Sequence, residues 1–365
     1  MATSATRTHR RTTIGAIAAA VVLAGCSLGG GSSEPSATTG ADGKACAEGG
    51  TVTVISHESF VLSDELKKQF TDTTGCRLQL TTAGDTGALT NRLVLTKSSP
   101  VADAVYGIDN TFSGRAVAED ILEPYEPTLP AGAEEHRLDG DGAKVLTPID
   151  FGDVCVNIDK TWFDTEGVTP PKTLDDLTKS DYKNLFVTPG APTSSPGLAF
   201  LLATIAEKGD SWPQYWRDLK ANGVKITSGW SDAYNVDFSA GEGKGDRPIV
   251  LSYASSPPFT IPEGKDEPTT EALLDTCFRQ VEYTGVIKGA KNEAGAQAFV
   301  DFMLSDDVQA SIPDAMYMFP VSRDVKLPKI WAKWARTPFS PYGIDPERVA
   351  SERDAWLKEW SEITS

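Results

Sequence analysis

The chain has 365 residues, of which 40% are hydrophobic, and its 34 basic and 51 acidic residues give a formal net charge of −17. From about residue 46 onward there is room for one large or two medium domains with a sizeable core. The acidic balance disfavours nucleic acid or anionic lipid as a partner and is compatible with a long-range field that attracts a cationic ligand.

Residues 1–25 have the layout of a secretory signal peptide. Three arginines precede an uncharged apolar run, Ile14–Ala24, which is too short to span a bilayer. The ending Leu23-Ala-Gly-Cys26 resembles the lipobox of bacterial lipoproteins and predicts lipidation of Cys26, whereas the alternative is an ordinary cleaved signal with an incidental cysteine. Residues 26–45 are rich in small and polar residues and are expected to tether the body to the outer face of the cell membrane, with the lipid anchor as its only membrane contact.

The first half of the body alternates short apolar runs with amphipathic segments. The pattern predicts, in order, a strand over 51–55, a helix between its cap Ser63 and Gly75, a strand over 77–80, a helix from Asp85 to Leu95, and a strand over 102–106. Strands that alternate with helices of this length indicate βαβ units on a parallel sheet.

A second α/β stretch follows an extended segment over residues 147–159. It is expected to contain helices over 174–177, 197–207 and 212–220 and strands over 185–187, 224–226, 248–253 and 278–283, and helices over 294–304 and 346–360 complete the chain. This organisation predicts two lobes, one of residues 46–147 plus 286–365 and one of residues 148–285, with hinge strands near 147–158 and 248–285. Ligands of such sheets bind beyond the carboxyl ends of the strands, so a cleft between the lobes is the expected site.

Four cysteines follow Cys26, namely Cys46, Cys76, Cys155 and Cys277. In an oxidising compartment an even number of cysteines predicts two disulfides. The first two of them flank neighbouring predicted strands, which favours the pairing Cys46–Cys76 and Cys155–Cys277, although spacing alone leaves all three pairings open. None of the four has the spacing of metal ligands, and histidine is scarce, so no metal site is expected.

Catalytic motifs are missing from the sequence. No Gly-x-Ser-x-Gly or His-Glu-x-x-His pattern occurs, and Gly241-Glu-Gly-Lys-Gly-Asp246 lacks the spacing of a phosphate-binding loop. The only histidines after the signal region, His57 and His136, are a poor stock of general bases. These observations favour a binding protein that needs no cofactor over an enzyme.

Aromatic and acidic residues at predicted strand ends are the candidates for ligand binding. Trp230, Tyr253 and Tyr317 lie where core packing does not obviously require a ring, and such rings hold cations at about 0.5–2 kcal/mol per contact. Asp85 would face a cationic ligand from the opposite lobe. The structural alternatives are that the rings belong to the core and that Asp85 only caps a helix. Ser194 opens a helix, where it either meets a ligand phosphate or hydroxyl or is simply a cap.

Four motifs occur in one order along the chain. They are Gly107-Ile-Asp-Asn110, Thr193-Ser-Ser-Pro-Gly-Leu198, Gly229-Trp-Ser-Asp-Ala-Tyr234 and Val250-Leu-Ser-Tyr253. Together they resemble the thiamine-binding proteins of bacterial ABC importers over residues 51–360. The resemblance implies a type II periplasmic-binding-protein fold, α/β with two lobes of mixed, mainly parallel sheets around a central ligand cleft. It also implies delivery of thiamine or its phosphates to ABC permease subunits, and we expect a monomer.

The resemblance implies roles for single residues as well. Asp85 occupies the place of a carboxylate that pairs with the aminopyrimidine of thiamine. Trp230 and Tyr253 occupy the places of rings that enclose the ligand, and Ser194 lies toward its hydroxyethyl or phosphate end.

Two departures from the family pattern leave the choice of ligand open. His57 stands where the family usually has tyrosine, and Tyr317 stands where a tryptophan is common; histidine is a poorer face for a cation and can itself become charged near neutral pH. One alternative is the same fold with another small cation, a polyamine or ferric ion, although Tyr253 lacks the adjacent tyrosine of an iron site. Another is a thiamine-degrading enzyme, which would need a free cysteine as its nucleophile.

Overall fold

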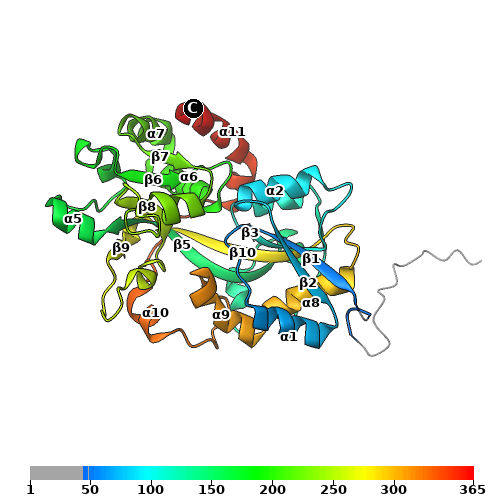
Figure 1. The fold of residues 1–365 in the computed structure, drawn as a ribbon. Helices are drawn as coiled ribbons and strands as arrows, with labels where there is room; N and C mark the ends of the chain where they lie inside the picture. The colour runs from blue at the N-terminus through cyan, green and yellow to red at the C-terminus, as the bar shows by residue number, and fades with distance from the viewer. Residues whose placement is uncertain (1–43, 48) are drawn as a thin grey trace, which may run out of the picture. The chain divides into compact units, whose positions relative to one another are not determined.

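The computed structural model describes residues 44–47 and 49–365 (Figure 1). The predicted signal peptide, the lipidation site Cys26 and the tether up to residue 43 lie outside the described residues. Within the described ranges, no helix has both the length and the apolar composition that a membrane span requires.

The first five elements form a parallel sheet with its covering helices. In chain order they are β1 (Thr51–Ser56), α1 (Asp64–Thr74), β2 (Arg77–Thr82), α2 (Thr86–Leu95) and β3 (Ala104–Asp109). β1 lies in the middle and pairs in parallel with both β2 and β3. α1 starts at Ser63, whose side chain accepts the Leu66 N–H, and ends at Gly75, whose φ of 75° suits glycine. The predicted βαβ units are therefore confirmed, with β3 shifted toward the C-terminus.

Two long strands, β5 (Thr147–Asp159) and β10 (Phe278–Ile287), run antiparallel through the middle of the sheet. The strand order is β2-β1-β3-β10-β5-β8-β6-β7. Beyond β5 lie β8 (Ile249–Tyr253), β6 (Phe186–Pro189) and β7 (Lys225–Thr227), and β6 pairs in parallel with both of its neighbours. The sheet is mixed as expected, and each of its antiparallel pairings within the described residues involves β5 or β10.

The remaining helices lie around this sheet, and the remaining short strands pair with β5 or β10 (Figure 1). They are α3 (Ser113–Ala118), β4 (Leu122–Glu123), α4 (Gly142–Val145), α5 (Lys160–Glu166), α6 (Ser195–Lys208), α7 (Trp212–Ala221), β9 (Thr270–Ala272), α8 (Glu293–Met303), α9 (Asp306–Met316), β11 (Phe319–Pro320), α10 (Lys329–Trp334) and α11 (Pro346–Thr364). The segment predicted as a helix over 174–177 is a short 3₁₀ turn, Asp175–Thr178. α9 has Asp306 and Asp307 in its first turn, and its interior Pro313, a residue that ordinarily ends a helix, hides its length in the sequence.

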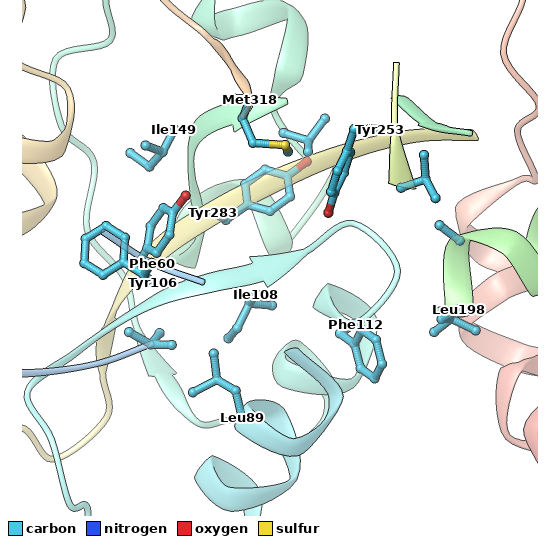
Figure 2. Packing of buried hydrophobic residues seen from close by; sticks show 14 of the residues in the cluster. Phe60, Leu89, Tyr106, Ile108, Phe112, Ile149, Leu198, Tyr253, Tyr283 and Met318 are labelled. Carbon is cyan, nitrogen blue, oxygen red and sulfur yellow. The ribbon is translucent and has the colours of Figure 1, made fainter. Parts of the chain in front are cut away.

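Aromatic side chains fill the core beside the two long strands. Figure 2 shows Tyr106, Tyr253 and Tyr283 close to β10, with Met318 near them. The rings of Phe60 and Tyr106 lie 4.4 Å apart, and all five side chains are at most 9% exposed. Burial of each large side chain contributes about 1.5–3 kcal/mol, so this packing gives the site a rigid floor.

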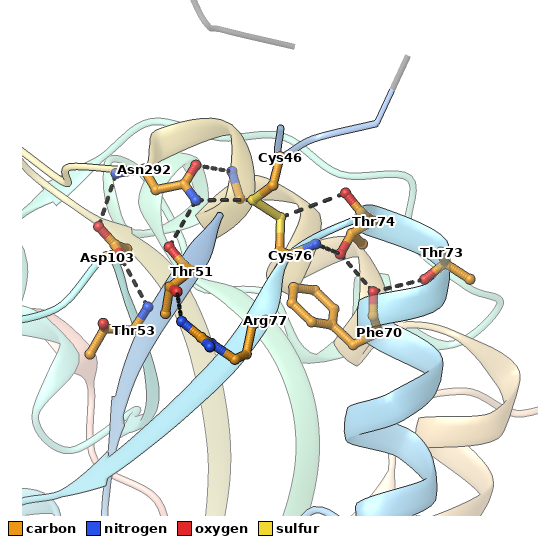
Figure 3. The surroundings of a disulfide bond; sticks show 11 residues. Cys46, Thr51, Thr53, Phe70, Thr73, Thr74, Cys76, Arg77, Asp103 and Asn292 are labelled. Atoms are coloured by element: carbon orange, nitrogen blue, oxygen red, sulfur yellow. Dashed lines mark hydrogen bonds between the residues drawn. A yellow bond between two sulfur atoms is a disulfide. The ribbon is translucent and has the colours of Figure 1, made fainter. Parts of the chain in front are cut away.

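The structure contains the two disulfides Cys46–Cys76 and Cys155–Cys277, the pairing that the neighbouring strands favour. The first ties the segment before β1 to the start of β2 (Figure 3). Asn292, which caps α8, donates a hydrogen bond to the Thr51 carbonyl beside it. These contacts join the edge of the sheet to α8.

The C-terminal helix α11 packs against α7. Trp216 of α7 and Trp360 of α11 meet edge to face with ring centroids 5.3 Å apart. α7 belongs to the segment that the sequence assigns to the second lobe, whereas α11 belongs to the segment assigned to the first. The lobe boundaries therefore stay a prediction, and the C-terminal helix bridges the two segments.

Candidate ligand-binding site

A cavity of about 30 Å³ brings together residues from both sides of the two long strands. Its walls are formed by His57, Ser59, Asp85, Thr86, Ser195, Pro196, Trp230, Tyr253, Glu282, Met316 and Met318. Four of the six predicted ligand-binding residues are among them. The volume suits about two water molecules, so a two-ring ligand requires the walls to move apart.

Asp85 joins three segments through its carboxylate. Oδ1 accepts hydrogen bonds from the N–H groups of Thr86 at 2.6 Å and Ser195 at 3.3 Å, and Oδ2 accepts from the N–H of Trp230 at 3.0 Å. Asp85 is thus the N-cap of α2, and it also bonds residues far along the chain. A carboxylate has about four acceptor positions, so Oδ2 retains one for a ligand donor.

Trp230 and Tyr253 form an aromatic wall. The Trp230 indole stacks on Tyr234 at 5.0 Å, and its N–H donates to the Ser252 hydroxyl at 3.0 Å. Tyr253 lies 6.2 Å from Trp230 and donates its hydroxyl proton to Gln280 at 3.1 Å. Because both rings are held by their polar atoms, their orientation is fixed before a ligand arrives.

Ser194 and Tyr317 do not lie on the cavity wall. Ser194 is fully buried and caps α6 by accepting the Gly197 N–H, and the next residue, Ser195, lines the cavity instead. Tyr317 stacks on Phe259 and turns its edge toward Trp230 at 6.2 Å. In this arrangement Ser194 organises the helix start and Tyr317 supports the aromatic wall from behind.

His57 and Glu282 form a buried pair at the cavity. Nε2 of His57 lies 3.4 Å from Oε2 of Glu282, and the same oxygen accepts the Tyr106 hydroxyl at 2.9 Å. The Tyr106 hydroxyl also contacts Asp150, which lies directly opposite Glu282 in the pairing of β5 with β10. The sequence prediction missed Glu282 and Asp150. Their signal is a carboxylate directly between two apolar residues of a predicted extended segment, where burial is costly unless the group has a partner.

Their surroundings shift the pKa values of Asp150 and Glu282 in opposite directions. Burial raises the pKa of Asp150 well above its usual value, and the charge of Glu282 raises it further. Burial also acts to raise the pKa of Glu282, but the charge of His57 and the hydrogen bonds that Glu282 accepts lower it overall. These opposite shifts favour the negative charge on Glu282 and the proton on Asp150.

Glycines permit two close approaches at the site. A Cβ on Gly107, whose φ is 98°, would lie 2.1 Å from Cδ2 of His57, so only glycine leaves room for the imidazole. A Cβ on Gly229 would lie 3.0 Å from Glu58 Oε1 and 3.4 Å from the Asp85 carboxylate. The glycines of two sequence motifs thus shape the site.

The surroundings of the cavity are rich in acid. Burial, together with the charges of Asp85 and Asp232, raises the pKa of Glu58. Burial raises the pKa of Asp109 to about 6, although Asp109 accepts the Ser195 hydroxyl. Of the described cavity-wall residues, His57 alone can carry a positive charge. The electrostatic environment therefore favours a cation.

The described residues contain no group of three or more His, Cys, Asp or Glu side chains placed to hold a metal ion. The hydrogen bonds and the packing already account for the acids around the cavity. The arrangement offers recognition of a flat, positively charged molecule.

Residues 58–310 match the family of bacterial extracellular solute-binding proteins, a match that covers more than half of the chain. The chain belongs to this family. The thiamine-binding periplasmic protein of Salmonella typhimurium is 31% identical to this solute-binding protein over 322 residues, which cover 86% of the chain and 93% of the relative. The thiamine-binding periplasmic protein of Escherichia coli is 30% identical over 329 residues, with the same coverage.

Solved structures confirm the type II periplasmic-binding-protein fold. A periplasmic thiamin binding protein superposes with a TM-score of 0.76 at 30% identity, covering 86% of this chain and 96% of that chain. Iron-bound HitA from Pseudomonas aeruginosa superposes with a TM-score of 0.68 at 22% identity, covering 87% of this chain and all of that chain. The second likeness shows the fold alone. This solute-binding protein therefore works outside the cytoplasm as a component of transport.

Proposed function

We propose that this protein captures thiamine or its phosphates outside the cell membrane and delivers them to an ABC permease. The observation that carries the proposal is an acid-rich cavity with an aromatic wall of Trp230 and Tyr253. Thiamine has two flat rings and a permanent positive charge, and aromatic faces and carboxylates are the groups that attract such a cation. The names of the relatives at 30–31% identity support the same ligand.

Binding is coupled to closure of the two sides of the cleft. Asp85 accepts a hydrogen bond from the amino group of the aminopyrimidine at its remaining acceptor position, while Trp230 and Tyr253 enclose the rings. A ligand that contacts both sides stabilises the closed form by its differential affinity for the two forms. Ser194 and Tyr317 act from behind the wall, through the start of α6 and the packing of Trp230.

Lipidated Cys26 anchors the protein to the outer face of the membrane, and the monomeric body has no catalytic role. The four cysteines of the described residues are paired in disulfides, so none of them offers the free thiol of a thiamine-degrading enzyme. Replacement of Cys26 by serine tests the anchor, since the variant is expected to leave the membrane fraction.

Calorimetric titration of the tether-trimmed protein tests the ligand. Thiamine and its mono- and diphosphate are titrated in turn, with spermidine and ferric citrate as competing candidates. Sub-micromolar binding of at least one thiamine compound, with none of the other two ligands, is the expected result. Neither heat nor a thermal shift with any of the three thiamine compounds would overturn the proposal.

A further inference from the structure

The His57–Glu282 pair connects the cavity to the middle of the sheet. His57 follows β1 and Glu282 lies in β10, and they are only 6% and 4% exposed. Both nevertheless line the cavity. A charged pair in this position faces a ligand that enters the cavity, and water screens its charges only weakly.

Hydrogen bonds from neighbouring side chains fix the position of the Glu282 carboxylate. Its Oε1 accepts the Gln280 amide at 3.0 Å, and its Oε2 accepts the Tyr106 hydroxyl at 2.9 Å. These donors stabilise the ionised form of the carboxylate. A quaternary nitrogen has no hydrogen to donate, so it can be neutralised by proximity alone, without displacing either neighbour.

The protonation of His57 responds to the same carboxylate. Nδ1 accepts the Ser59 N–H at 3.2 Å, so in the neutral ring Nε2 carries the hydrogen and points it at Glu282. Burial lowers the pKa of His57, but the charge of Glu282, with smaller contributions from Asp85 and Glu58, raises it overall.

The groups that face the ring come from each neighbouring element. They are Glu282 on β10, Asp85 at the start of α2, Glu58 beside His57 and the Tyr106 ring of β3 at 5.5 Å. Within the described residues none of these groups is a cation, so a proton on His57 is the one positive charge that this set of groups can place beside Glu282.

We propose that Glu282 neutralises the positive charge of the bound ligand and that His57 releases its proton as the ligand binds. The positive charge beside Glu282 is thereby carried by protonated His57 before binding and by the ligand after binding. The inference rests on the proposed function, because it takes the ligand to be a cation of the thiamine type. Its consequence is that affinity falls with acidification, since protonated His57 competes with the ligand for the same carboxylate.

Calorimetric titration with thiamine in two buffers of different ionisation enthalpy measures the proton release. The wild type is expected to release a larger fraction of a proton at about pH 6.5 than at about pH 8.5, because protonation of free His57 decreases as the pH rises. The dissociation constant is expected to rise by up to about tenfold per unit as the pH falls through the pKa of His57 in the free protein. His57→Gln, which retains a donor toward Glu282, is expected to bind thiamine with no buffer dependence.

An uncharged analogue of thiamine shows how much of the ligand's affinity depends on its positive charge and how much on its shape. Deazathiamine has a thiophene ring in place of the thiazolium and lacks the positive charge. Glu282→Gln is expected to weaken thiamine at least tenfold while changing the affinity for deazathiamine much less, and the neutral ligand also reports that the variant is folded. Should this variant not fold, the buffer comparison between the wild type and His57→Gln decides alone.

Two outcomes are distinguishable. Thiamine binding by the wild type with equal heats in both buffers and a dissociation constant independent of pH overturns the proton exchange and leaves the proposed function standing. Absence of thiamine binding at every pH overturns the proposed function itself.

Discussion

Replacing Asp85 with alanine is expected to weaken thiamine binding by at least tenfold. The carboxylate accepts the Trp230 N–H at 3.0 Å from across the cavity. A hydrogen bond to a charged group contributes about 1.5–3 kcal/mol, so its loss shifts the equilibrium toward the open form by about 10- to 150-fold. The lost contact with the ligand adds to this effect.

The same substitution also removes a helix cap, and asparagine separates the two roles. Asp85→Asn keeps an oxygen for the Thr86 N–H but loses the charge. Asp85→Ala is expected to lower the free energy of unfolding by about 1 kcal/mol, and Asp85→Asn by much less. Calorimetric titration gives the affinities and urea unfolding gives the stabilities of the three proteins. Wild-type affinity for thiamine in both variants would refute the role of the carboxylate.

Three further predictions test the aromatic wall, a glycine and a disulfide. Trp230→Ala is expected to weaken thiamine binding about 2- to 30-fold, and Trp230→Phe less, because a cation–π contact contributes about 0.5–2 kcal/mol. Equal affinity of the alanine variant and the wild type in a titration contradicts this. Gly107→Ala is expected to destabilise the protein by about 1–3 kcal/mol more than Gly140→Ala. Both glycines have positive φ, but only a Cβ at position 107 would clash with a side chain. Equal midpoints of urea unfolding for the two variants would count against the clash. Loss of the Cys155–Cys277 bond by double serine substitution is expected to cost about 2–5 kcal/mol, given its sequence separation of 122, and an unchanged melting temperature would argue otherwise.

Local signals in the sequence were sufficient for much of the fold. Ser63 and Gly75 bracket α1 because a side-chain cap and a left-handed glycine act over only a few residues. The Cys46–Cys76 pairing was favoured over the two other possible pairings because the first two predicted strands could be neighbours, and β1 and β2 do pair. Asp85 and Trp230 were predicted as ligand-binding residues because each follows a predicted strand, and both line the cavity.

The parts that the sequence could not reveal depend on contacts between distant segments. Glu282 and Asp150 lie in strands that read as buried, and only the pairing of β5 with β10 places them opposite each other. Ser194 and Ser195 are equivalent in the sequence, and the turn at the start of α6 decides which of them reaches the cavity. Tyr317 was assigned to the ligand, but the stacking of its ring on Phe259 depends on a residue 58 positions away that no local pattern connects to it.

The two long strands are cross-linked at one end, and their pairing is irregular in the middle of β10. The Cys155–Cys277 bond cross-links β5 to the residue that precedes β10. The register of β10 with its neighbours shifts between Glu282 and Thr284. A shift of this kind interrupts the hydrogen-bond ladder and lets a strand bend, so the pivot of any opening motion is expected there. The ligand's positive charge therefore acts at Glu282, in the same stretch of β10 that sets the angle between the two sides of the cleft. Recognition of the charge and closure of the cleft are thereby coupled through one segment of backbone.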